Sequence, residues 1–224
     1  SSDLLLRISM MIMMNKFLIL ILLALISCLS LNAKERYDTE GWYGIEIETE
    51  IFEDIELEFG QQLRMKEDME IVKNYITDLG IGWRISDKYK ISGFARYKKF
   101  PDKAEPSYYF NFYFEEESDP ADVEYRLKFD HRFLDGGEYE FFIRNRLEFK
   151  FNLFDDLKPF WNSEIFYQAA GTNNRWDKMR ITFGLEYEFI KDNEISFYYR
   201  YESELFRGTN QIANIIGIYY GLEI

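Results

Sequence analysis

The residues in this sequence whose types could do chemistry are arginines and glutamates that recur two positions apart. Arg144, Arg146 and Glu148 are one example, and similar charged positions follow along most of the chain. Side chains two apart in an extended strand point to the same side, so each stretch would carry its charges on one face. Such a row of charges can pair as salt bridges, line a narrow polar pore or bind an anionic or zwitterionic solute. The set predicted to line one inner face is Arg84, Arg96, Arg126, Asp130, Arg132, Arg144, Arg146, Glu148, Glu164, Arg180, Glu186, Glu188, Arg200 and Glu202.

Two sets of residues resemble catalytic groups, but the residues around them do not support a catalytic role for either set. Glu186 and Glu188 lie two apart, as an acid–base pair of carboxylates could, but the arginines near them favour ion pairing. His131, the single histidine, falls on the apolar side of its segment, near the expected rim of the fold. Some outer-membrane lipid enzymes use a His–Ser pair at such a place, but no serine and acid partner with recognisable spacing accompanies His131. We therefore predict no catalytic residue.

Metal, cofactor and nucleic-acid chemistry are not indicated. One histidine and one cysteine, Cys28, are too few for the usual zinc sites, which take two or three such ligands. The sequence contains no phosphate-binding loop and no nucleophile elbow. The net charge of −13 argues against a nucleic-acid partner, because phosphate binding requires a basic face. We expect no metal, no cofactor and no nucleic acid.

The elements that must position these charges are strands. In the segment 138–152, EYEFFIRNRLEFKFN, nearly every second residue is apolar, and Asn145 and Phe142 are the exceptions. A period of two is strand geometry, with one aromatic face and one charged face. At roughly 3.3 Å per residue the segment spans about 40 Å or more, which is long for a globular strand and ample for a tilted membrane-spanning strand.

The rest of the chain repeats this pattern and predicts one all-β domain. About eleven strand-like segments alternate with short polar turns, without linkers. Bacterial single-chain barrels normally have even strand numbers, so we expect 10–12 strands. Aromatic residues are 19 % and charged residues 30 % of the chain, which suits a barrel with lipid outside and a charged lumen. The predicted fold is a transmembrane antiparallel meander β-barrel.

The N-terminal segment is predicted to be a leader. A basic region follows Met14, the apolar run 17–29 comes next, and Ala33 precedes a polar stretch. This order is typical of a secretory signal peptide cleaved after Ala33, and the apolar run is short for a transmembrane helix. The expected domains are therefore the leader 1–33, whose residues 1–13 precede the start methionine, and the barrel 34–224. An alternative is that segment 25–28 is a lipoprotein box, which would leave Cys28 lipidated.

The turns and the last strand indicate the outer membrane. Connections near 52–54, 86–88, 118–122, 154–157 and 191–193 are short and acidic, whereas those near 100–106, 168–177 and 205–210 are longer. Short periplasmic turns and longer extracellular loops are the rule in outer-membrane barrels. Tyr220, Leu222 and Ile224 share one face, as expected of a C-terminal strand that engages the barrel-assembly machinery. Outer-membrane lipid is the other expected partner, and a small solute is a third candidate.

Five stretches together resemble a known family. They are GWYGIEIE at 41–48, VEYRLKFDHRF at 123–133, FFIRNRLEFKF at 141–151, PFWNSEIFY at 159–167 and NRWDKMRITFGLEYEF at 174–189. The chain resembles the Gram-negative outer-membrane barrel family catalogued as domain of unknown function 2490. The resemblance implies an outer-membrane β-barrel and brings no catalytic or ligand-binding residue with it.

Four functions remain open from the sequence. The leading expectation is a non-enzymatic outer-membrane barrel that is structural or forms a narrow passive pore with a charged lumen. A small-solute channel or transporter is the first alternative, and a lipid enzyme with its site at the rim is the second. The third is a soluble periplasmic β-barrel that binds an apolar ligand, which would turn the aromatic face inward.

Overall fold

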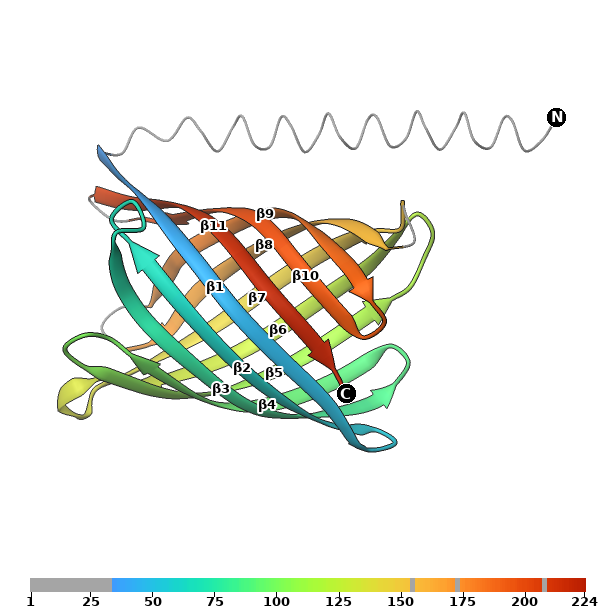
Figure 1. Ribbon diagram of the computed structural model, residues 1–224. Helices are drawn as coiled ribbons and strands as arrows, with labels where there is room; N and C mark the ends of the chain where they lie inside the picture. Colours follow the sequence, from blue (N-terminus) through green and yellow to red (C-terminus); the bar gives the residue numbers. More distant parts are fainter. Residues whose placement is uncertain (1–33, 154–155, 172–173, 207–208) are drawn as a thin grey trace. The chain divides into compact units, whose positions relative to one another are not determined.

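The chain folds into a closed β-barrel. The computed structural model describes residues 34–153, 156–171, 174–206 and 209–224, so the predicted leader, including Cys28 and the Ala33 cleavage site, lies outside the described residues. Eleven strands make up the described barrel (Figure 1). They are β1 Lys34–Phe52, β2 Ile55–Lys66, β3 Ile71–Ser86, β4 Tyr89–Lys99, β5 Ala104–Glu116, β6 Ala121–Phe133, β7 Tyr139–Phe151, β8 Leu157–Ala170, β9 Arg175–Ile190, β10 Asn193–Glu204 and β11 Thr209–Glu223.

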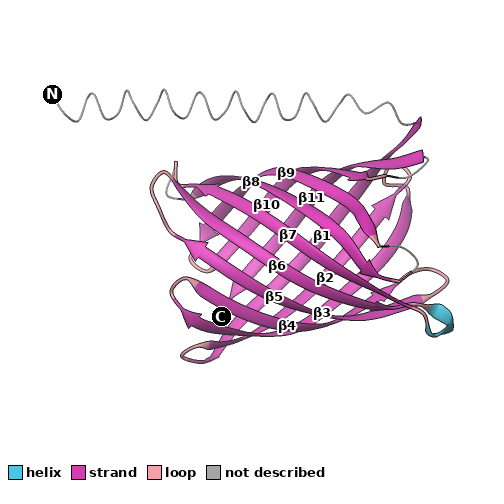
Figure 2. Cartoon of the chain, turned by 180° about the vertical axis from the view of Figure 1, so that it is seen from behind, coloured by secondary structure: helices cyan, strands magenta, loops and turns pink. Residues whose placement is uncertain are grey.

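Helical structure is minor in this fold. A short 3-10 turn, Asp135–Gly137, lies between β6 and β7, and Figure 2 shows it from behind as the coloured helix of the barrel. Within the described residues, no helix has the length and apolar character needed to cross a membrane. The prediction of an all-β barrel of 10–12 strands is therefore confirmed.

The odd number of strands decides how the barrel closes. Each strand pairs antiparallel with the next along the chain, from β1–β2 to β10–β11. Eleven alternating strands leave β1 and β11 running in the same direction, and these two neighbours close the barrel as a parallel pair (Figure 1). The Ile224 amide donates a hydrogen bond of 2.9 Å to the Glu48 carbonyl across this seam. The expected even strand number does not hold for the described residues.

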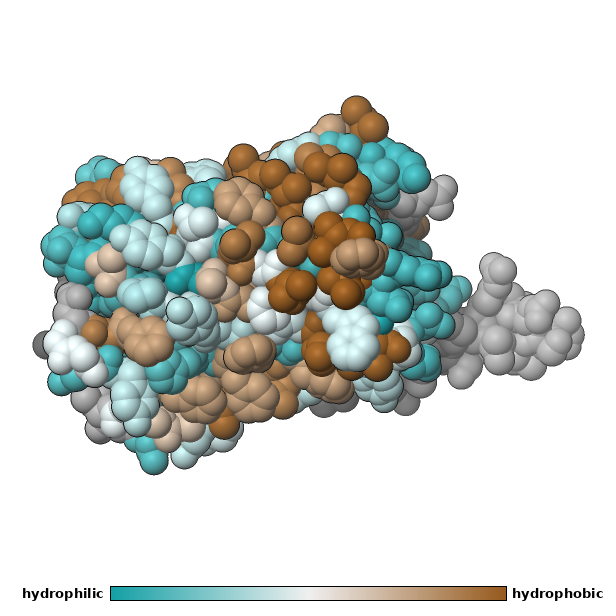
Figure 3. Space-filling view, turned by 90° about the horizontal axis from the view of Figure 1, so that it is seen from below, coloured by the Kyte–Doolittle hydropathy of each residue, from teal (hydrophilic) through white to brown (hydrophobic). Residues whose placement is uncertain are grey.

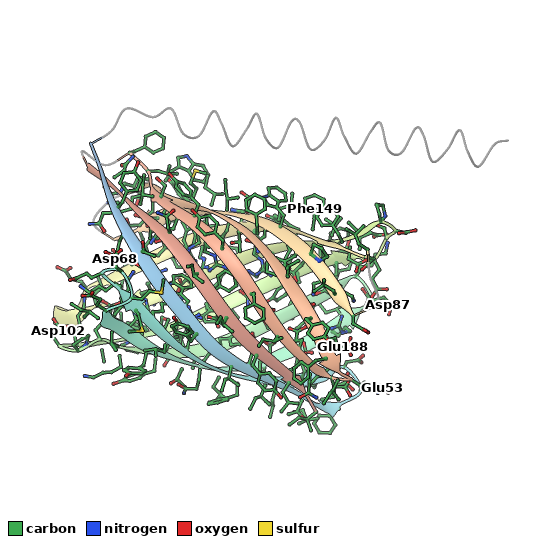
Figure 4. The ribbon with its side chains drawn as sticks, turned by 45° about the horizontal axis from the view of Figure 1, so that its top comes forward. Glu53, Asp68, Asp87, Asp102, Phe149 and Glu188 are labelled. Carbon is green, nitrogen blue, oxygen red and sulfur yellow. The ribbon has the colours of Figure 1, made fainter. Side chains whose placement is uncertain are left out.

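The connections divide between the two ends of the barrel. We call the end where β11 finishes the C-terminal end and the end where β1 starts the N-terminal end. Figure 4 labels Glu53 and Asp87 at the C-terminal end, and Asp68 and Asp102 at the N-terminal end. Three connections at the C-terminal end, 53–54, 87–88 and 191–192, have two residues, but the other two, 117–120 and 152–156, have four and five. The connections at the N-terminal end also have four or five. The predicted contrast therefore holds for three turns only. It does not hold near 118–122 and 154–157, and the loops predicted to be longer near 100–106 and 205–210 are shortened to four residues because the strands continue into them.

The long loop predicted at 168–177 is wrong. Strand β8 continues to Ala170 and β9 begins at Arg175, so the connection is 171–174. The pairs Tyr167↔Trp176 and Gln168↔Arg175 continue the ladder past a bulge. The polar residues that indicated a loop are accommodated because a strand at the barrel rim can extend beyond an apolar band into water.

The strand register turns the apolar faces outward and the charged faces inward. In β7, Ile143 and Leu147 lie outside while Arg144 and Arg146 lie inside, as the pairing with β6 and β8 requires. Large apolar side chains consequently gather over the middle of the outer surface (Figure 3). Phe142, the exception in the sequence pattern, points inward and is only 3 % exposed. The barrel thus has an apolar exterior and a charged interior.

Glycines on the inner wall make room for aromatic rings. A Cβ atom at Gly217 would lie 2.0 Å from the ring of Tyr198, and one at Gly44 would lie 2.4 Å from the ring of Tyr219. The two tyrosine rings can therefore lie flat along the wall, with their centroids 5.9 Å apart. Their flat placement keeps the middle of the barrel open for the charged side chains.

Candidate functional site

The candidate site is the lumen itself. One cavity of about 870 Å³ is lined by residues from all eleven strands. It reaches Lys98 and Phe100 near the N-terminal end, and Asp192 and Glu223 at the C-terminal end. Among the described residues, fourteen acidic and fourteen basic side chains line it. The cavity as a whole is therefore close to electrically neutral.

The structure brings the fourteen sequence-predicted residues together around this cavity. Asp130 faces inward but is 2 % exposed, behind the side chains of Arg132 and Arg144 that it contacts. The thirteen others line the cavity directly: Arg84, Arg96, Arg126, Arg132, Arg144, Arg146, Glu148, Glu164, Arg180, Glu186, Glu188, Arg200 and Glu202.

Glu164 on β8 is the centre of the ion pairing. Its carboxylate accepts hydrogen bonds from Arg144 Nη2 at 2.8 and 3.0 Å and from Arg126 Nη2 at 2.8 Å. Arg180 Nη1 lies 3.4 Å from the second oxygen. Glu164 is only 5 % exposed, so three guanidiniums from three neighbouring strands compensate one buried charge.

Further pairs extend this contact into a network. Asp130 Oδ2 lies 2.7 Å from Arg132 Nη2 and 3.6 Å from Arg144 Nη1. On the other side, Glu202 accepts from Arg180 Nε at 2.5 Å and from Lys178 Nζ at 3.1 Å. We call these five cations and three carboxylates the Glu164 network. Its members are Arg126, Asp130, Arg132, Arg144, Glu164, Lys178, Arg180 and Glu202.

Aromatic rings hold the excess positive charge of this network. The ring centroid of Phe166 lies 4.3 Å from the guanidinium of Arg144, 4.6 Å from that of Arg180 and 5.7 Å from Lys178 Nζ. The guanidinium of Arg132 lies 4.1 Å from the Phe142 ring. A cation over a ring face is stabilised where carboxylates are too few, particularly in a desolvated place.

Trp42 on β1 gathers three more arginine contacts. The guanidinium of Arg64 lies 3.6 Å from its ring centroid, that of Arg200 at 5.1 Å and that of Arg180 at 5.3 Å. The indole N–H donates to Glu40 at 2.9 Å, which fixes the ring, and Trp42 is only 2 % exposed. Trp42 is thus a buried platform for cations.

Most of the acidic lining residues lie in the half of the lumen nearer the C-terminal end. Lys90 Nζ contacts three carboxylates there, Glu48 Oε1 at 3.6 Å, Glu58 Oε1 at 3.3 Å and Glu56. Lys150 Nζ on β7 contacts Glu186 at 2.8 Å. The acidic side chains that line the cavity in this half are Glu46, Glu48, Glu58, Glu115, Glu124, Glu148, Glu186, Glu188, Asp192, Glu194 and Glu223.

The charges of the described lining are therefore separated along the barrel. Divided at the midpoints of the strands, the N-terminal half carries ten basic and three acidic lining residues. The C-terminal half carries eleven acidic and four basic ones. The lumen has a positive half and a negative half, which neither the net charge nor the neutral total reveals.

Comparison with known proteins places the chain in a family. Residues 39–213 match the family model described as "Protein of unknown function (DUF2490)". The chain belongs to this family. The family predicted from the sequence resemblance is thus confirmed.

The DUF2490 chain also matches solved structures. One is the NanC porin structure in a rhombohedral crystal form, at 10 % sequence identity, 73 % coverage of this chain and 86 % of that chain, with a TM-score of 0.48. A search among curated protein sequences finds no match.

His131 and the pair Glu186 and Glu188, which resembled catalytic groups in the sequence, make other contacts in the DUF2490 chain. His131 lies on the outer face, with its ring centroid 4.6 Å from that of Phe133 and 5.3 Å from that of Tyr139. Glu186 is paired with Lys150. Among the described residues, no group of three or more His, Cys, Asp and Glu side chains is placed to hold a metal ion. The geometry therefore shows aromatic packing at His131 and ion pairing at Glu186.

Several lumen residues were missed by the sequence reasoning. Arg64 alternates with Leu63 and Met65, and Glu46 alternates with Ile45 and Ile47, so the period of two already placed both on the inner faces. Lys90 could have been found in the same way. Trp42 shares the parity of Glu46 and could also have been placed inward, but an aromatic residue near the start of a strand also suits an outer aromatic belt, and its contacts with arginines were not predicted.

Proposed function

We propose that this protein is an outer-membrane β-barrel that acts as a narrow passive pore. The outward aromatic residues support the membrane part of this proposal. On β3, Tyr75 and Trp83 bracket Leu79 and Ile81, and all four are more than half exposed. Eight residues span about 26 Å along the strand, or about 20 Å along the barrel axis at a tilt of about 40°. This distance approaches the apolar band of about 25 Å that outer-membrane barrels present between their aromatic girdles.

Polar groups on the outer face are paired in a way that suits lipid. The Tyr125 hydroxyl donates to Asn145 Oδ1 at 2.5 Å, and the Tyr199 hydroxyl donates to Asn214 Oδ1 at 2.6 Å. Water would satisfy these amides on a soluble surface, whereas in a bilayer a polar group needs a partner from the protein. The pairing explains how Asn145, an interruption in the apolar pattern, is tolerated.

The single observation that carries the pore proposal is the charged cavity reaching toward both ends of the barrel. Spread over a barrel height of roughly 30 Å, the volume of about 870 Å³ corresponds to a mean cross-section of about 30 Å². A passage with this mean cross-section would admit only ions and small solutes. Charged walls keep such a passage wet.

The direction of the two faces argues against the soluble alternative. A barrel that binds an apolar ligand in water needs an apolar interior and a polar exterior. Here the interior carries Arg144, Glu164 and Arg180, whereas Phe110 and Leu79 on the exterior are 65 % and 59 % exposed. The chemistry of the faces is the reverse of what that function requires.

A structural role is the second candidate, and one observation favours it. Arg144, Glu164 and Arg180 are 7 %, 5 % and 9 % exposed, so the middle of the barrel is densely filled. A filled lumen would brace the wall without conducting. Steady conductance therefore separates the two candidates.

Localisation is tested first. The expressed protein is expected in the outer-membrane fraction, with a gel mobility that changes on boiling. Recovery from the soluble periplasm without a mobility shift would contradict the membrane proposal. Lipid and, through β11 with its outward Tyr220 and Leu222, the barrel-assembly machinery are the partners that we propose.

Conductance is tested next in a planar bilayer with heat-modifiable, refolded protein. The pore proposal expects small, steady current steps that scale with salt. If the bilayer stays insulating after the folded barrel has inserted, as shown by protease protection, the pore proposal is contradicted and the structural role is supported.

A further inference from the structure

We infer that Arg64 and Arg200, held beside Trp42, form a binding site for a small anion that carries a carboxylate or phosphate group. This inference deepens the proposed pore function, since it names the class of solute that the lumen takes. It starts from two arginines whose charges are not neutralised in the described part of the barrel. Both side chains line the cavity.

Each of the two arginines is fixed by its Nε, and among the described residues no side chain accepts a hydrogen bond from its outer nitrogens. Arg64 Nε donates to Gln62 Oε1 at 2.5 Å, and Arg200 Nε donates to Thr182 Oγ1 at 2.9 Å. Among the described residues, neither has a carboxylate within 4.0 Å, unlike Arg180, which has two. The two guanidiniums are therefore oriented donors without an anionic partner.

The distance between the two groups suits one bound oxyanion. Their Cζ atoms lie 3.6 and 5.1 Å from the centroid of the same Trp42 ring, so they are at most about 9 Å apart. An oxyanion that accepts hydrogen bonds of about 2.8 Å from each guanidinium can bridge such a gap. The planar fork of arginine is also the donor geometry that carboxylate and phosphate groups match best.

The surroundings lead an anion to this place and hold it there. The ten basic lining residues of the N-terminal half attract anions, and the eleven acidic residues beyond repel them. The ring of Tyr198 lies 4.8 Å from the Arg200 guanidinium and stands, with Tyr219, on the acidic side of the pair. An anion that enters from the N-terminal end therefore finds at Arg64 and Arg200 two cations without a carboxylate partner among the described residues, before it reaches the acidic half of the lining.

Trp42 supplies a direct optical probe of this site. The chain has four tryptophans, and Trp83, Trp161 and Trp176 belong to the outer faces of their strands. Replacing these three with phenylalanine leaves Trp42 as the single indole. In refolded barrel in neutral detergent, iodide is added as an anionic quencher and acrylamide as a neutral one. Sodium benzoate and inorganic phosphate are then added as competitors, which separates carboxylate from phosphate recognition.

Trp42 is only 2 % exposed, so quenching by iodide is expected only from an ion bound at Arg64 and Arg200 beside the ring, and benzoate or phosphate should relieve it. Arg64→Gln and Arg200→Gln should each lower the iodide quenching constant at least about threefold, because the bridging site loses one of two charges. Acrylamide quenching should stay unchanged. Arg64→Lys should recover part of the loss, and Arg175→Gln, at the N-terminal end of β9 and outside the cavity, is the matched control.

Two results would overturn the inference. One is iodide quenching that is absent from the parent barrel, or that the Arg64 and Arg200 variants leave unchanged, while a boiling-dependent gel shift shows the protein folded. The other is quenching that neither benzoate nor phosphate relieves at any concentration that leaves acrylamide quenching intact. The assay needs no current, so an insulating barrel that binds anions would refute the pore alone, and a conducting barrel without anion binding would refute the site alone.

Discussion

The charge of Glu164 should be worth several kcal/mol to the folded barrel, and Glu164→Gln tests this. Glutamine keeps the shape and one acceptor oxygen but removes the charge shared by Arg126, Arg144 and Arg180. Removing one partner of a buried ion pair typically costs 3–5 kcal/mol, because a charge is left uncompensated.

The remaining contacts place the expected cost at the low end of this range. Arg180 keeps Glu202 at 2.5 Å, and Arg144 keeps Asp130 at 3.6 Å. Arg126 has no second carboxylate within 4.0 Å among the described residues. We therefore expect a loss of about 3 kcal/mol in the free energy of unfolding, which is roughly a hundredfold change in the folded-to-unfolded ratio.

The assay is a reversible urea titration of the barrel in lipid vesicles, followed by gel mobility without boiling. The matched control is Glu115→Gln, which breaks the half-exposed pair of Glu115 with Arg84 at 3.2 Å and should cost less than about 1 kcal/mol. The double variant Glu164→Gln with Arg126→Met should recover part of the loss, because the stranded cation is removed. A Glu164→Gln barrel as stable as the Glu115→Gln barrel would refute the reasoning.

Three further predictions follow from the lumen wall, the outer face and the separated charges. Gly217→Ala would push a Cβ to 2.0 Å from the Tyr198 ring and should cost about 1–3 kcal/mol in the same urea titration, whereas Gly60→Ala, with its nearest atom at 3.5 Å, should be close to neutral. Tyr125→Phe removes the donor to Asn145 and should cost about 1 kcal/mol in lipid, and a second change, Asn145→Leu, should restore the stability unless the outer face is wet. The positive and negative halves of the lumen should make the current asymmetric in voltage, by about twofold in 0.1 M salt and less in 1 M salt, where the screening length falls from about 10 to about 3 Å. A symmetric current at low salt would contradict the last of these.

The local periodicity of the sequence was enough to predict the barrel and its inner face. Parity within a strand decides on which side a residue lies, so Arg144 and Glu164 could be assigned to the lumen without knowing any partner. The pairing of Arg126 with Glu164 could not, because the two are 38 residues apart and meet only through the order and register of β6, β7 and β8. The separation of charge along the axis also needs that register. The contacts of Trp42 with Arg180 and Arg200 could not be predicted for the same reason, because these two residues come from strands distant in the sequence.

The parallel pairing of β1 with β11 decides on which side of the barrel each end of the chain lies. Barrels with an even number of strands consist of whole hairpins, and their chains enter and leave on one side. An eleven-strand barrel consists of five hairpins and one further strand, so β1 starts on one side and β11 finishes on the other. In any membrane that this barrel spans, a reporter fused ahead of β1 and a reporter fused after Ile224 face different compartments. The same geometry forbids a short circular permutation, because a linker between the ends would have to pass through the lumen or the lipid.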